Sequence, residues 1–87
     1  MSNILHITNS DSDVLTHVGA NLKRLRKPAG LSQGALAEAS GISRRMIAGL
    51  EAGNSNISLS SLDKLAQALE VGFVDLVSDP ARERRRI

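Results

Sequence analysis

The segment LSQGALAEASGISRRMIAGLEAG, residues 31–53, decides the fold of this chain. It contains two short runs with apolar residues at helical spacing, over about 33–40 and 44–52, and each run follows a serine and precedes a glycine. Serine is a favoured first cap of a helix, and glycine adopts the left-handed backbone that ends many helices. The segment therefore predicts two short helices joined by a tight turn, which is the helix-turn-helix arrangement.

Apolar spacing on either side predicts three more helices. The first is expected over about 13–27, capped by Asp11, Ser12 or Asp13 and stopped by Pro28, which cannot continue a helix. The fourth should begin at Ser58 or Ser60 and reach about residue 69, and a short fifth should span about 73–77. The expected inward positions are Val14, Leu15, Val18, Leu22, Leu25, Leu36, Ala37, Ala39, Met46, Ile47, Leu50, Leu62, Leu65, Ala66, Leu69, Phe73, Leu76 and Val77. The predicted fold is all-α, a compact five-helix bundle that contains the helix-turn-helix.

The chain of 87 residues has room for one small domain, with one aromatic residue and no cysteine. We expect a flexible arm over residues 1–12, the helix-turn-helix domain over 13–78, and a basic tail or the start of a linker over 79–87. No signal peptide and no membrane span are expected, because no apolar run approaches about 18 residues. A cytoplasmic protein that does not act on membranes is the expectation.

Positive charge is concentrated around the predicted helix-turn-helix. Residues 20–53 contain six cations, Lys23, Arg24, Arg26, Lys27, Arg44 and Arg45, but only two acidic residues. Residues 54–81 contain four acidic residues and one cation, Lys64. Such asymmetry predicts a small domain with one positive and one negative side.

The first turn of the third predicted helix contains the candidate base-reading residues. Arg44 and Arg45 directly follow the cap Ser43, and an arginine there can donate two hydrogen bonds to guanine in the major groove. Ala48 is able to contact a thymine methyl group, and Gly49 would permit close approach of the helix. The alternative is that the two arginines are merely a solvated helix face, although cations are unfavourable at a helix N-terminus.

Phosphate contacts are expected beside this helix. Free backbone N–H groups at helix starts attract anions, which makes Gln33 and Ser43 candidates. The polar loop of Asn54, Ser55 and Asn56 is a third candidate. Contacts of this kind fix the register of a protein on DNA without reading its sequence.

Other kinds of function have little support in the sequence. No serine has a convincing histidine and carboxylate companion, so we do not expect an enzyme. No metal site and no cofactor are expected, because the two histidines have no partner at metal-ligand spacing. The arginine-rich run over residues 82–86 could bind nucleic acid, but a solvated tail is the simpler interpretation.

The chain resembles the lambdoid-phage repressor and Cro class of helix-turn-helix domains, the XRE family. The resemblance rests on LKRLRK at 22–27, GLSQ at 30–33, LA at 36–37, SGISRR at 40–45, IAGLEAG at 47–53 and SLSSLDKLAQALEV at 58–71. Two departures are visible: Gly34-Ala35 where the family usually has a glutamate, and Glu70 with Gly72 at the junction of the last two helices.

The resemblance implies a five-helix domain that binds palindromic double-stranded DNA as a homodimer. It implies DNA-facing roles for Gln33, Ser43, Arg44, Arg45 and Gly49. It also implies a structural ion pair between Arg26 and Glu51, which the residues alone do not reveal.

The sequence leaves open both the length of the whole protein and one alternative function. The family includes longer regulators in which such a domain precedes an effector-binding domain, often a cupin barrel, so the chain could be a compact regulator or one piece of a longer one. The main alternative function is an antitoxin-like interaction module that neutralises a partner protein and can regulate its own operon. The leading interpretation is a transcriptional regulator, and a repressor in particular.

Overall fold

The computed structural model describes the backbone of residues 2–81 and the side chains of residues 14–81. Its elements are all helices: α1 (Ser2–Arg26), α2 (Gln33–Ser40), α3 (Arg44–Glu51), α4 (Leu59–Leu69) and α5 (Phe73–Val77). The prediction of an all-α, five-helix fold is confirmed. Of the predicted basic tail or linker start over 79–87, residues 82–87 lie outside the described residues.

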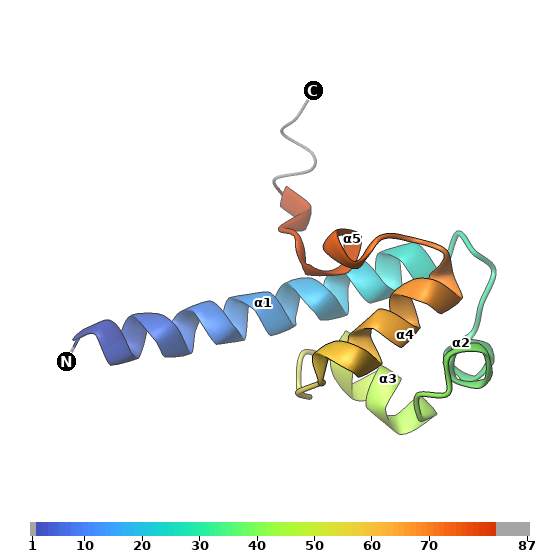
Figure 1. Cartoon of the computed structure of the whole chain (residues 1–87), viewed down its shortest axis with the longest axis horizontal. Helices are drawn as coiled ribbons and strands as arrows, with labels where there is room; N and C mark the ends of the chain where they lie inside the picture. The colour runs from blue at the N-terminus through green and yellow to red at the C-terminus, as the bar shows by residue number, and fades with distance from the viewer. Residues whose placement is uncertain (1, 82–87) are drawn as a thin grey trace.

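The first helix is longer than predicted. α1 begins at Ser2, so the start expected near Asp13 is wrong, and Asp11, Ser12 and Asp13 lie within the helix rather than capping it. No glycine or proline precedes Gly19 to interrupt the helical backbone. Figure 1 shows the first half of α1 extending beyond the other helices. The helix ends at Arg26, shortly before Pro28, as the proline predicted.

An aliphatic core joins the helices. The buried apolar residues are Val18, Leu22, Leu36, Ile47, Leu50, Leu62, Leu65, Ala66, Leu69 and Leu76. All ten are predicted core positions. Two other predictions are wrong, because Val14 is 45% exposed and Ala39 lies on the outer side of α2. Val14 lies one turn before Val18, the first residue of α1 that reaches the core.

Serine and glycine define the ends of the short helices as predicted. The hydroxyls of Ser32, Ser43 and Ser58 accept hydrogen bonds from backbone N–H groups in the first turns of α2, α3 and α4. Gly41 ends α2 with a left-handed backbone, φ 80°. Glu70 takes the same left-handed conformation after α4, with φ 59°, which a residue with a Cβ adopts at a cost. The turns of the motif therefore follow directly from its residue types.

Two residues of α1 fix its contacts with the neighbouring helices. Gly19 lies against α3 so closely that an added Cβ would overlap the backbone carbonyl of Leu50. Asn21 is 1% exposed, and its amide donates to the backbone carbonyls of Leu76, at 2.9 Å, and Ser78, at 2.7 Å. α1 therefore packs against α3 on one side and α5 on the other, as Figure 1 shows.

None of the helices within residues 2–81 has both the length and the apolar character needed to cross a membrane.

Candidate nucleic-acid interface

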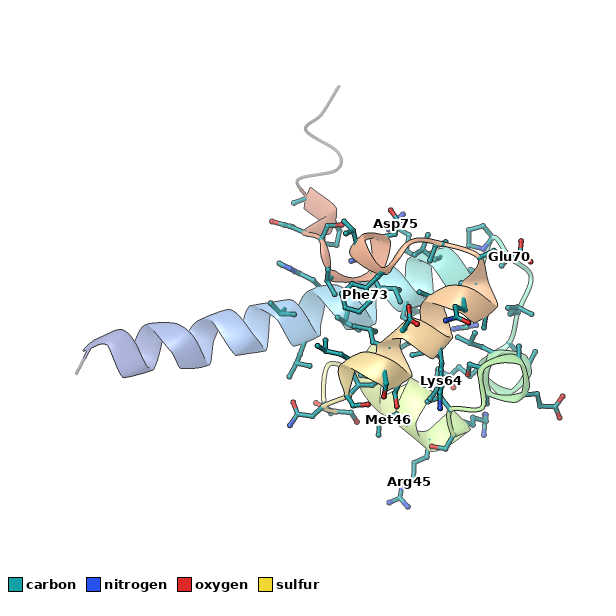
Figure 2. The ribbon with its side chains drawn as sticks, in the orientation of Figure 1. Arg45, Met46, Lys64, Glu70, Phe73 and Asp75 are labelled. Carbon is teal, nitrogen blue, oxygen red and sulfur yellow. The ribbon has the colours of Figure 1, made fainter. Side chains whose placement is uncertain are left out.

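The third helix presents one face to the core and the opposite face to solvent. Ile47 and Leu50 are 0% and 1% exposed, which fixes the rotation of α3 about its axis. Arg45 is exposed, and in Figure 2 its side chain points away from the bundle at the start of α3. A protruding helix start with a free cation is the shape that a major-groove reader requires.

Arg44 is also exposed, but it lies nearer to α2. A Cβ added to Gly34 would be 3.9 Å from Arg44 Cδ, so the first turn of α2 leaves room for the aliphatic stem of this arginine. Ser43 caps α3 by accepting from the backbone N–H of Met46 at 3.0 Å and is itself exposed. Both arginines are therefore held on a capped, anchored first turn.

Gly49 has a neighbour that the sequence did not reveal. A Cβ added there would collide with the side-chain hydroxyl of Ser55, and the Gly49 carbonyl accepts from the backbone N–H of Asn54 at 2.8 Å. Gly49 therefore makes room for the following loop within the protein itself. Ala48 is partly exposed on the same helix.

The loop after α3 is consequently fixed to that helix. Asn54 and Asn56 are exposed, whereas Ser55 is partly covered because it packs on Gly49. A hollow of about 310 Å³ lies between this loop and the starts of α3 and α4. Its lining includes Ser43 and Asn56, two of the predicted phosphate-contacting residues.

A hydrogen-bond network connects the scaffold to the start of α2. Arg26 Nε and Nη2 donate to the two carboxylate oxygens of Glu51 at 2.7 and 3.0 Å, and Arg26 Nη1 donates to the Leu31 carbonyl at 2.8 Å. The Gln33 side-chain Nε2 donates to Glu51 Oε1 at 3.1 Å. The Arg26–Glu51 pair that the resemblance implied is thus present, and it has Gln33 as an additional member.

The network is largely shielded from water and favours the charged forms of both partners. The side chains of Arg26 and Glu51 are 11% and 6% exposed. Burial opposes ionisation of Glu51, but hydrogen bonds from Arg26 and Gln33 and the positive charges of Arg26 and Lys23 lower its pKa. The hydrogen bond to Glu51 raises the pKa of Arg26. The pair is therefore ionised at neutral pH.

Three structural residues were missed by the sequence reasoning. Asn21 had a possible signal, since a polar residue between Val18 and Leu25 interrupts an apolar helical face. No signal in the sequence indicates the contact of Gly19 with α3 or the packing of Ser55 on Gly49, because both depend on how the chain packs in three dimensions. Within residues 14–81, no three histidine, cysteine or acidic side chains lie close enough together to hold a metal ion.

Comparison with known proteins agrees with this geometry. Residues 22–76 match the helix-turn-helix family HTH_3. The chain is 41% identical over 66 residues to an uncharacterised HTH-type transcriptional regulator, y4dJ, of Sinorhizobium fredii, a match that covers 76% of this chain and 86% of the relative. It is 36% identical to the regulator SutR of Escherichia coli and 37% identical to the antitoxin PezA of Streptococcus pneumoniae. These two matches cover 72% and 71% of this chain but only 35% and 39% of those longer proteins.

Solved structures show the same fold. The hypothetical transcription factor NHTF from Neisseria superposes with a TM-score of 0.81 at 29% identity, with 86% of each chain covered. The restriction-modification controller protein C.AhdI from Aeromonas hydrophila gives 0.69 at 42% identity, covering 71% of this chain and 94% of that one. Helix-turn-helix transcriptional regulators, to which y4dJ and SutR are assigned by name, are DNA-binding proteins rather than enzymes. The chain therefore belongs to the helix-turn-helix family of DNA-binding transcriptional regulators.

Proposed function

We propose that this protein is a repressor that binds a palindromic operator in double-stranded DNA as a homodimer in the cytoplasm, with α3 in the major groove. The observation that carries the proposal is the start of α3, where Arg44 and Arg45 are exposed while Ile47 and Leu50 anchor the helix in the core. Arg44 and Arg45 would read bases, and Ala48 would approach a thymine methyl group. Gly49 would supply no side chain of its own.

Phosphate contacts would come from residues that flank α3 on both sides. Gln33 lies at the first position of α2, and Ser43 caps α3. On the other side, Asn54, Ser55 and Asn56 form a loop that is hydrogen-bonded to Gly49. These elements surround the reading helix, which is the arrangement needed to hold it in register on the duplex.

Selection of bound sequences from random DNA tests this proposal. The expected product is a symmetric site whose two halves are about one helical turn apart, with a guanine in each half. The mass of the complex should correspond to two chains on each duplex, and a promoter carrying the site should lose activity when the protein is present. The proposal would be contradicted if the selection enriched no sequence, or if it enriched an asymmetric site bound by one chain.

The similarity to PezA supports an antitoxin-like interaction module as the second candidate. Asp63 on α4, Glu70 in the turn after it and Asp75 on α5 are exposed, and their negative charges would attract a basic partner. Purification from the native host distinguishes the two candidates. A stoichiometric partner protein together with absence of selective DNA binding would favour the module, whereas selective DNA binding without a partner would favour the repressor.

A further inference from the structure

We propose that Glu51 is a positioning residue for DNA binding, because its carboxylate fixes which end of the Gln33 side-chain amide faces the phosphate backbone. This inference rests on the proposed function, in which Gln33 contacts a phosphate. It assigns Glu51 a role beyond the brace between α1 and α3. The partner in question is one phosphate group of the operator duplex.

The orientation of the Gln33 amide follows from the chemistry of its partner. A side-chain amide has an oxygen end that only accepts and a nitrogen end that only donates hydrogen bonds. An ionised carboxylate only accepts, so the Gln33 amide must turn its nitrogen toward Glu51, at 3.1 Å. The second N–H of that nitrogen is then left to donate elsewhere. A phosphate oxygen, which also only accepts, is a suitable partner for it.

The negative charge of Glu51 is balanced by Arg26. A carboxylate close to DNA would normally repel the phosphate backbone. Here Arg26 contacts both oxygens of Glu51, at 2.7 and 3.0 Å, and the pair carries no net charge. Glu51 therefore orients Gln33 without adding uncompensated negative charge to the interface.

The hydrogen bonds of Arg26 also make this network rigid. Arg26 also donates to the Leu31 carbonyl at 2.8 Å, two residues before Gln33, so the same guanidinium holds the carboxylate and the chain entering α2. The side chain of Glu51 is 6% exposed, which limits the freedom of its carboxylate to rotate away. The amide is therefore oriented before DNA arrives, and such preorganisation lowers the entropy lost on binding.

The test is methylphosphonate scanning of the selected operator, in which phosphates are replaced one at a time by a neutral group. Wild-type protein should lose about tenfold in affinity at the phosphate that Gln33 contacts, as expected for a hydrogen bond to a charged group. The Gln33→Ala variant should lose that sensitivity. The Glu51→Gln variant should lose it too, while it keeps the sensitivities at other phosphates, because its neutral amide no longer dictates the orientation of Gln33.

The matched control is Asp63→Asn. Asp63 Oδ2 accepts from Gln67 Nε2 at 2.8 Å on the exposed side of α4, so this change removes the same charge from the same kind of pair away from α3. Asp63→Asn should leave the affinity loss at each replaced phosphate unchanged. The positioning role would be overturned if Glu51→Gln kept the wild-type sensitivity to each phosphate replacement, or if its sensitivity fell equally at all phosphates. Either result would leave the proposed function intact. Wild-type protein that selects no DNA sequence would instead overturn the proposed function itself.

A second measurement does not depend on how well a variant folds. In the wild-type complex with DNA, the side-chain amide signals of Gln33 in an NMR spectrum should shift when the contacted phosphate becomes a methylphosphonate. They should not respond to replacement of distant phosphates. Signals that stay the same for every phosphate would overturn the Gln33–phosphate contact, and with it the positioning role of Glu51.

Discussion

At the scale of single residues, Asn21 is the polar group on which the packing of α5 depends. It is fully enclosed, and its amide donates to two backbone carbonyls at the end of α5, those of Leu76 and Ser78. A buried carbonyl without a donor is costly, so this one side chain stabilises the contact of α1 with the end of α5. The two carbonyls lie 55 and 57 positions further along the chain than Asn21.

Replacing Asn21 with alanine should therefore lower the free energy of unfolding by about 2–3 kcal/mol, because two acceptors lose their donor and a small cavity forms. Urea denaturation followed by circular dichroism measures this loss. Gln67→Ala is the control, since the Gln67 side chain is exposed and its amide donates to Asp63 on its own helix. Equal stability of the two variants would contradict the role given to Asn21.

The stability of the fold should depend on pH through Glu51, and the sign of this dependence follows from the lowered pKa of Glu51. Its ionised form is favoured in the folded state, so its contribution to stability is fully present above the ordinary glutamate pKa of about 4.3. That contribution is lost as the pH falls through the lower folded pKa.

Wild-type protein should therefore lose more stability than Glu51→Gln between pH 7 and pH 3, although the variant is less stable at pH 7. Denaturation curves at several pH values measure the difference between the two proteins. Parallel decreases in stability for both would show that Glu51 does not contribute through its charge.

At the scale of the elements, the motif itself was predictable because its signals are local. Ser32 and Ser43 cap their helices and Gly41 takes the left-handed backbone, all within a few residues of the helix ends that they define. The start of α1 was not predictable in this way. Asp11, Ser12 and Asp13 are good caps in isolation, but nothing in the preceding residues breaks the helix.

The candidate site was likewise only partly predictable from the sequence. The exposure of Arg44 and Arg45 followed from the helical periodicity of Ile47 and Leu50. The bond from Gln33 to Glu51 did not, because it joins the beginning of α2 to the end of α3 and depends on how these helices pack. Helix periodicity indicates which face is buried, but it does not indicate which side chains meet across two helices.

Two glycines in helices should respond oppositely to alanine. At Gly19 an added Cβ would overlap the Leu50 carbonyl, so Gly19→Ala should destabilise the fold by about 1–3 kcal/mol through forced separation of α1 and α3. At Gly34 the added Cβ would find ordinary contact distances of 3.9 Å, so Gly34→Ala should stabilise α2 by up to about 1 kcal/mol. Thermal denaturation of the two variants compares them directly. A loss at Gly34 or a gain at Gly19 would contradict the packing described here.

The end of α4 offers a third test at this scale. Glu70 takes a left-handed backbone, which glycine adopts without steric cost. Glu70→Gly should therefore raise the free energy of unfolding by about 1 kcal/mol. Glu70→Ala is the control, because it removes the same charge but keeps the Cβ, and it should give no such gain. A similar gain in both variants would assign the effect to charge rather than to the backbone.

At the scale of the whole molecule, the scaffold and the proposed DNA-reading surface are separate. The aliphatic core joins the helices and Asn21 links α1 to the end of α5, whereas the start of α3 remains free at the surface. Removing a surface arginine from α3 should therefore change DNA binding much more than it changes folding. Binding should also weaken as salt rises, because contacts with phosphates release counterions from the DNA.

The most direct test of this account is the affinity of Arg44→Ala and Arg45→Ala for the selected operator, measured beside their affinity for unrelated DNA. Arg24→Ala is the charge-matched control, since Arg24 bonds to Asn21, which faces the end of α5. The account predicts that each α3 variant keeps wild-type stability and loses about 1–3 kcal/mol of operator binding, with a smaller loss on unrelated DNA. Operator affinity that is unchanged in both α3 variants, or reduced equally by Arg24→Ala, would contradict the claim that α3 reads the DNA sequence.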